Sequence, residues 1–301
     1  MPVPELVTVG EAFEDLIFAD LDRFPRPGEE VRTRTFVRTL GGGAVITAIA
    51  AARLGLGCRV VSGLSAAGAA HLRHERVRAL NLRRTDEPHA VTAAISTRAN
   101  RTFVTFMGVN DRLEPRLFEA LVAVRGRHVH FAFGPRRCGR WTTLVESLRR
   151  RGISTSWDFG WNEALLLDRR FMDLVTSLDY VFFNDQEARL YARRASLDAA
   201  IARWRRHPRV IVIKMGGRGS RWIAGGRVLE AAPPRVRAID PTGAGDAFNG
   251  GFLFARLRGY SPRRSLESGN FVGAMSTRAA GGIAALPRGS ELPPALRVGA
   301  S

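Results

Sequence analysis

The chain has 301 residues, 45% of them hydrophobic and 25% charged, so its composition is that of a globular protein rather than a disordered or fibrous one. Its formal charge of +18 attracts anions, but the arginines are scattered, and no zinc-finger spacing, basic zipper or aromatic RNA-binding signature accompanies them. We therefore expect no nucleic-acid partner, and we note that Lys214 is the single lysine of the sequence.

The N-terminal residues carry no basic segment followed by an apolar run, so we expect no signal peptide. The apolar stretch at 44–52 is far shorter than the roughly 20 residues that cross a bilayer. Cys58 and Cys138 form no metal-binding pattern and need not pair, which indicates a reducing compartment. These features predict a cytoplasmic protein without a membrane partner.

Apolar runs alternate with helical patterns along most of the chain. The runs predict strands, in chain order, at 6–9, 58–63, 128–133, 154–158, 180–183 and 210–214. The periodic segments predict helices at 44–54, 66–80, 141–150, 186–194, 244–257 and 262–279, with Gly55 closing the first. This alternation predicts an α/β fold, a doubly wound and mostly parallel sheet flanked by helices.

Two segments interrupt the alternation, at about 12–40 and 88–110. The first is rich in proline, glycine and charge and resembles an exposed strand at 31–37, and the second alternates over 90–106. We expect these segments to form a small β-sheet that acts as a lid over a site. No repeat or linker divides the chain, so we expect a single domain over 1–301.

The stretch 239–252 carries the most specific pattern. Gly243 and Gly245 lie in a loop that opens a helix near Ala244, and backbone N–H groups at such a helix start form an anion site. Asp246 falls in the first turn of that helix. By its position alone, Asp246 is either a residue that compensates the helix dipole or a base that takes a proton from an attacking hydroxyl.

Several motifs together resemble the PfkB/ribokinase family of carbohydrate kinases. Residues 240–246 read Asp-Pro-Thr-Gly-Ala-Gly-Asp, against the family pattern D-T-x-G-A-G-D. Further likenesses are the Gly-Gly turn and small-residue helix at 41–55, an N-x-x-E motif at 184–187, a glycine loop at 214–219 and the lid hinge at 24–29. Two departures are Ile46, where the first signature usually has asparagine, and Pro241, where the second usually has threonine.

The resemblance implies ATP-dependent phosphorylation of a hydroxymethyl group on a sugar or sugar derivative. Asp246 would be the base, and the N–H groups of Gly243, Ala244 and Gly245 would form the anion hole. Asn184 and Glu187 would organise Mg²⁺. The nucleotide contacts implied by the family are Asn184, Lys214, Gly216, Gly219, Thr242 and Asn270.

The family also implies where the substrate binds. Its expected contacts are Asp15, Gly41, Gly42, Gly43, Asn110 and Asp246. Asp240 and the turn at 281–282 resemble the regions that hold a monovalent cation such as K⁺ in many members. Lid strands in this family often pair between two subunits, so the resemblance implies a homodimer through the lid.

Alternatives remain open at this point. A nucleoside kinase of the same family would use the same machinery, with Ile46 and the aromatic residues Phe13, Phe36 and Phe106 as apolar area for a base. A catalytically idle binding or regulatory member is a second alternative. Asn184 and Glu187 also fit the role of a helix cap. Lys214 also fits a lysine retained by chance in an arginine-rich chain, and Asn270 also fits a buried amide within a helix. No third ligand follows His128 and His130, so we expect no metal there.

Overall fold

The short apolar segments assemble into a large sheet in a computed structural model that describes residues 3–97 and 100–297. From one edge to the other, its strands are β13 (Arg227–Ala231), β12 (Ser220–Ala224), β11 (Val210–Lys214), β10 (Tyr180–Asn184), β9 (Ser154–Asp158), β8 (His128–Ala132), β1 (Leu6–Gly10), β4 (Cys58–Ser62) and β5 (Arg78–Asn81). The strands from β11 to β5 pair in parallel, and β12 and β13 add an antiparallel hairpin at the edge.

Helices cover both faces of this sheet, because each face carries its own buried apolar cluster. On one face pack α1 (Gly43–Arg53), α2 (Ala66–His74), α8 (Ala244–Leu257) and α9 (Pro262–Ser276). On the other pack α3 (Leu113–Val122), α4 (Cys138–Arg150), α5 (Phe171–Ser177), α6 (Asp185–Ala192) and α7 (Leu197–Trp204). Short 3₁₀ helices lie at Gly108–Arg112, Glu163–Leu167, Gly216–Arg218, Gly289–Glu291 and Pro294–Leu296. The doubly wound architecture is therefore confirmed.

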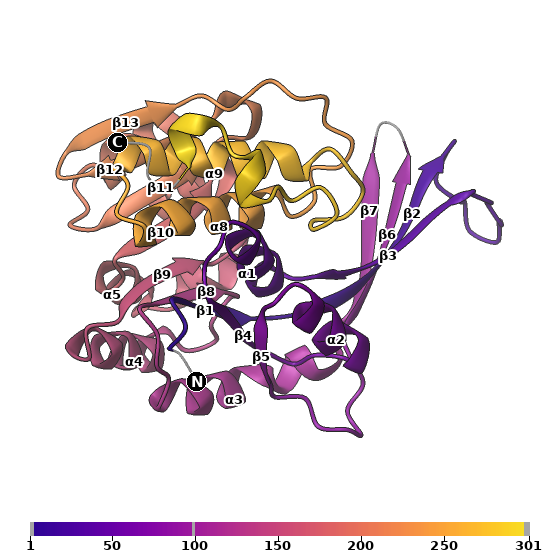
Figure 1. The fold of residues 1–301 in the computed structure, drawn as a ribbon, viewed down its shortest axis with the longest axis horizontal. Coiled ribbons are helices and arrows are strands. Elements are labelled where there is room, and N and C mark those ends of the chain that lie inside the picture. Colours follow the sequence, from indigo (N-terminus) through magenta and orange to yellow (C-terminus); the bar gives the residue numbers. More distant parts are fainter. Residues whose placement is uncertain (1–2, 98–99, 298–301) are drawn as a thin grey trace.

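A second, four-stranded sheet projects from one side of the body (Figure 1). Its order is β3 (Thr35–Gly41), β2 (Phe13–Leu21), β6 (Val91–Thr97) and β7 (Arg101–Phe106). β2 pairs antiparallel with β3 and parallel with β6, so the two segments that interrupt the alternation come together in one sheet. The separate small sheet expected from the sequence is therefore present.

Close contact between helices α1 and α8 brings distant parts of the chain together. A Cβ on Gly250 of α8 would lie 2.6 Å from the Cβ of Ala50 and 2.7 Å from the carbonyl oxygen of Thr47. Only glycine allows this approach. The glycine turn before α1 and the glycine loop before α8 therefore lie near each other.

The predicted strands at 154–158 and 210–214 and the helix at 244–257 have the expected bounds. The helix predicted at 66–80 is wrong in its second half, because α2 ends at His74 and residues 78–81 pair with β4 as β5. Arg76, with a φ of 58°, turns the chain between them. The strand predicted at 31–37 begins only at Thr35, and the sequence reading did not identify α3, α5, α7, β12 and β13.

Candidate functional site

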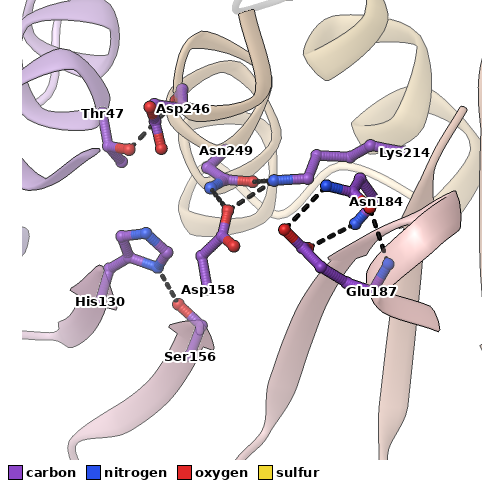
Figure 2. Close-up of polar contacts among 9 residues, drawn as sticks. All are labelled: Thr47, His130, Ser156, Asp158, Asn184, Glu187, Lys214, Asp246 and Asn249. Carbon is purple, nitrogen blue, oxygen red and sulfur yellow. Dashed lines mark hydrogen bonds and ion pairs between the residues drawn. The ribbon is translucent and has the colours of Figure 1, made fainter. Parts of the chain in front are cut away.

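Polar side chains gather where neighbouring strands of the large sheet end. Asp158, Asn184 and Lys214 are the last residues of β9, β10 and β11. The parallel register places Asn184 beside Lys214, and Figure 2 shows Asp158 and Lys214 meeting at Asn249 of α8. Ligands of α/β sheets bind at the carboxyl ends of the strands, so this edge is the candidate site.

Lys214 forms a buried ion pair with Asp158. Its Nζ lies 2.5 Å from Oδ2 of Asp158 and 3.4 Å from Oδ1 of Asn249, and Nδ2 of Asn249 donates to the same Asp158 oxygen at 2.6 Å. Burial raises the pKa of Asp158, but the charge of Lys214 and the hydrogen bonds from Lys214 and Asn249 together outweigh it and keep that pKa below its ordinary value. Burial lowers the pKa of Lys214, but the nearby carboxylates outweigh it and raise that pKa. Both groups are therefore charged.

Asp246 lies in the first turn of α8, close to the turn before α1. A Cβ on Gly43 would lie 2.9 Å from Oδ1 of Asp246, so a side chain at position 43 would displace the carboxylate. The hydroxyl of Thr47 donates to the Asp246 carbonyl at 3.1 Å. Burial, and then the charge of Asp158, raise the pKa of Asp246 to about 7 against the opposing effect of Lys214. The carboxyl group is therefore half-ionised near neutral pH.

The start of α8 has no side-chain cap. Gly243 precedes it with a φ of 72°, and no side chain accepts from its first N–H groups. Ala244 N–H donates to the Pro241 carbonyl at 3.2 Å, whereas those of Gly243 and Gly245 have no partner among the described residues. A Cβ on Gly245 would lie 3.2 Å from Nζ of Lys214. Free N–H groups beside an ammonium form an anion site.

The start of α6, in contrast, is closed by its own side chains. Oδ1 of Asn184 accepts from the N–H of Glu187 at 2.8 Å, and Oε2 of Glu187 accepts from the N–H of Asn184 at 2.8 Å, as drawn in Figure 2. Nδ2 of Asn184 donates to Oε1 of Glu187 at 2.7 Å. Burial and then Asp158 raise the pKa of Glu187 to about 7. The expected cap is present, and it holds a buried carboxylate at the site.

The loop after β11 needs its glycines. Gly216 and Gly219 have φ values of 57° and 87°, and a Cβ on Gly219 would lie 2.1 Å from the Ala231 carbonyl oxygen. Nδ2 of Asn270 donates to that same carbonyl at 2.8 Å. Thr242 does not face this loop, because its hydroxyl donates to Oδ1 of Asp240 at 2.6 Å. The expected nucleotide residues therefore divide between two places.

The expected substrate residues lie at the junction of the small sheet with the body. A Cβ on Gly41 would lie 2.0 Å from Oδ2 of Asp15, so only glycine fits beside this carboxylate. Burial and then Asp240 raise the pKa of Asp15 to about 6. Nδ2 of Asn110 donates to the Ala12 carbonyl at 3.1 Å, and its buried Oδ1 has no partner among the described residues. That oxygen can accept a hydrogen bond from a ligand.

Ile46 is a core residue. It is 3% exposed, and Cβ atoms on Gly243 and Gly282 would lie 2.7 and 2.6 Å from its Cδ1. The side chain therefore packs beneath the glycine loop, while Phe36 and Phe106 lie exposed on the small sheet.

The pair His128 and His130 does not form a metal site with other described residues. The ring nitrogens of His128 bond Ser154 and Ser156, both at 2.7 Å, so the histidine pair belongs to the core. Over residues 3–97 and 100–297, no group of three His, Cys, Asp or Glu side chains is arranged to hold a metal ion. The site residues predicted from the sequence do not include Asp158, Asn249 and Arg101.

Known proteins resemble this chain over most of its length. The sequence model described as pfkB family carbohydrate kinase matches residues 3–288. Ribokinase of Mus musculus is 27% identical over 97% of the chain and 94% of its own length, and a nucleoside kinase of Methanothermobacter thermautotrophicus is 27% identical over 85% and 83%. The structure of a putative ribokinase from Agrobacterium tumefaciens has a TM-score of 0.80 at 19% identity and covers 96% of both chains. None of the helices in the described part of the chain has the length and apolar character to cross a bilayer.

Proposed function

Because the chain belongs to the pfkB family of carbohydrate kinases and so phosphorylates a sugar or nucleoside, we propose that it transfers a phosphoryl group from ATP to a hydroxymethyl group of a sugar or sugar derivative. One observation carries this proposal: the partly buried Asp246 carboxyl group lies between the glycine turn at Gly43 and the uncapped start of α8. That position suits a group that takes a proton from a hydroxyl as the hydroxyl attacks a phosphorus atom.

Asp246 acts as the general base. A base is most effective when its pKa lies near the working pH, and burial raises that of Asp246 to about 7. The ionised carboxylate accepts the hydroxyl proton at one of its oxygens. Lys214 does not serve as the base, because its ammonium is charged and paired with Asp158.

The N–H groups of Gly243 and Gly245, with a shared contribution from Ala244, bind the transferred phosphoryl group. They cost no reorganisation at the moment of reaction, because the backbone already presents them. Lys214 adds a positive charge under Gly245. We therefore assign Lys214 to the anion site rather than to the rest of the nucleotide, whose contacts we assign to Gly216, Gly219 and Asn270. Thr242, whose hydroxyl is bonded to Asp240, belongs with the anion site instead.

Asn184 and Glu187 fit a role in holding Mg²⁺. The carboxyl groups of Asp158, Glu187 and Asp246 all raise the pKa of the single Lys214 ammonium, so the site has an excess of negative charge that a divalent cation would offset. Mg²⁺ keeps several waters, and Glu187 can accept hydrogen bonds from them. When bound, the ion would neutralise charge on the phosphates. A kinase works where ATP is supplied, so we place the enzyme in the cytoplasm.

Asp15, Gly41, Gly42, Gly43 and Asn110 bind the substrate. The Asp15 carboxylate and the free Oδ1 of Asn110 accept hydrogen bonds from hydroxyl groups, which matches a polyhydroxylated ligand better than an apolar one. The small sheet closes over this site as a lid. The exposed residues Phe36 and Phe106 lie on one face of this sheet, and we propose that they pair with a second copy to form a homodimer that sedimentation would detect.

An ADP-release assay across sugars, sugar derivatives and nucleosides tests this function. We expect turnover with a sugar class and none with Asp246→Asn. Turnover restricted to nucleosides would favour the second candidate, which the nucleoside kinase relative supports. Ligand-induced stabilisation without ADP release from any substrate would instead indicate a binding protein.

A further inference from the structure

The carboxylate of Asp240 lies immediately before the glycine loop and is surrounded by donors. Its Oδ1 accepts from the N–H and the hydroxyl of Thr242 at 2.9 and 2.6 Å, and its Oδ2 accepts from the N–H of Gly281 at 2.9 Å. Its side chain is 13% exposed. Two segments thus meet at one negative charge, and that charge needs a counter-cation.

Arg101 of the small sheet supplies one. Its Nη1 lies 2.6 Å from Oδ1 of Asp240 and also bonds the hydroxyl of Thr242. Burial raises the pKa of Asp240, but the hydrogen bonds from Gly281 and Thr242 and the charge of Arg101 outweigh it and lower that pKa. The ion pair joins the first residue of β7 to a loop 139 residues later in the chain.

The resemblance to the family implies a monovalent cation at this carboxylate, and the residues present do not fit one. A cation such as K⁺ needs free oxygen ligands, but Oδ1 of Asp240 already accepts from Arg101 and twice from Thr242. A bound ion would also lie beside the guanidinium and be repelled by it. The guanidinium has the charge of the ion and is attached to the chain.

We propose that Arg101 is a positioning residue that takes the place of a monovalent cation at Asp240. It holds the turn of Asp240 and Thr242, which leads directly into Gly243, and so fixes the N–H groups of the anion site. This inference rests on the proposed function. It follows that the kinase reaction needs no K⁺ and that the anion site is set only when the small sheet is in place.

The first test is the rate with KCl replaced by tetramethylammonium chloride. The wild type is expected to keep its kcat, since its cation is built in. Arg101→Gln is expected to lose about tenfold or more in kcat, as for a lost hydrogen bond to a charged group, and to recover part of it with K⁺ but not with tetramethylammonium. Arg101→Lys, which keeps the charge, is expected to remain independent of K⁺.

Arg38→Gln is the matched control, because Arg38 is an arginine of the same sheet that pairs with Glu14 instead. It is expected to behave as the wild type. Activation of the wild type by K⁺, or an Arg101→Gln variant with full activity, would overturn the proposal.

A second readout does not depend on activity and so separates this proposal from the proposed function. Crystals soaked in a thallium(I) salt reveal a monovalent-cation site by anomalous scattering. We expect no thallium at Asp240 in the wild type and a thallium peak there in Arg101→Gln. A peak at Asp240 in the wild type, or none in a folded Arg101→Gln protein, would overturn the role of Arg101 whether or not a substrate is found.

Discussion

Helices α6 and α8 both begin at the carboxyl ends of the strands of the large sheet, but their first N–H groups have different partners. α6 starts at Asn184, whose side chain and that of Glu187 satisfy the first N–H groups. α8 starts at Gly243 in the left-handed region, with no side chain in that place. Capping stabilises a helix by about 1 kcal/mol, so α8 forgoes stability that α6 gains. The N–H groups at an uncapped helix start are free to bind a ligand. At a capped start, side chains of the protein already accept hydrogen bonds from these N–H groups.

The largest expected effect is that of Asp246→Asn. Because it removes the proposed base, kcat should fall by about 10³-fold, while ADP still binds in calorimetry. The matched control is Asp185→Asn, since Asp185 occupies the first turn of α6 and pairs with Arg218 at the surface. That variant should keep its activity.

The melting temperature of Asp246→Asn shows whether its loss of activity comes from the missing carboxylate or from unfolding. The pKa of Asp246 is raised from 3.8 to about 7, so the folded protein binds its proton more tightly than the unfolded chain does. Stability from this group is therefore present at acid pH and lost as pH rises through 7. Asp246→Asn should melt no lower than the wild type at alkaline pH. A large fall in its Tm would contradict the assignment.

The next effect is that of Gly243→Ala. A Cβ there would lie 2.7 Å from Cδ1 of Ile46 and would strain the positive φ, so the N–H donors should move and kcat should fall by about 10²-fold. Gly259→Ala is the control, because Gly259 also has a positive φ, 84°, but no atom lies within 4 Å of its Cβ position. It should cost about 1 kcal/mol in denaturant unfolding without loss of kcat.

The effect of pH on kcat/KM is expected to be smaller than the effects of these substitutions. Asp246 must be ionised to accept a proton, so kcat/KM should fall about tenfold for each pH unit below about 7. The profile is measured at saturating Mg²⁺, because burial also raises the pKa of Glu187 to about 7. A profile that stays flat down to the ordinary range of aspartate would contradict the role of Asp246.

The smallest expected effect is that of Asn184→Ala on stability. Loss of this cap should cost about 1 kcal/mol in denaturant unfolding. Ser196→Ala, which removes a similar cap from α7, should cost a similar amount. Only Asn184→Ala should also raise the Mg²⁺ concentration needed for half-maximal rate. Equal Mg²⁺ dependence in the two variants would make Asn184 a structural cap alone.

Local pattern predicted much of the fold and part of the site. The helix at 244–257 was predicted with its observed bounds, since the glycine loop before it and its apolar residues both act within a few turns. Residues 78–80 were predicted as helix and form part of a strand, because pairing with β4 overrides a weak local preference. Ile46 was considered as apolar area for a base, but its contacts with the glycine loop came only from the fold.

The site residues that were not predicted differ in how far the sequence pattern could have identified them. Asp158 ends a strand that was predicted with its observed bounds, so its position at the carboxyl end could have marked it. Asn249 follows Asp246 by three residues, and that helical spacing places both on one face. Arg101 left no signal, because it is one of many arginines in a strongly basic chain.

The sequence by itself determined most strands of the parallel sheet and the helix at 244–257, which loops need glycine and which side chains stand at strand ends, because those features depend on neighbours a few residues away. Tertiary structure decided the partners. Lys214 meets Asp158 across 56 residues and Arg101 meets Asp240 across 139, and these pairs depend on which strands lie side by side. The lone lysine stood out in the sequence, but only strand order made it the partner of a buried carboxylate beneath the anion site.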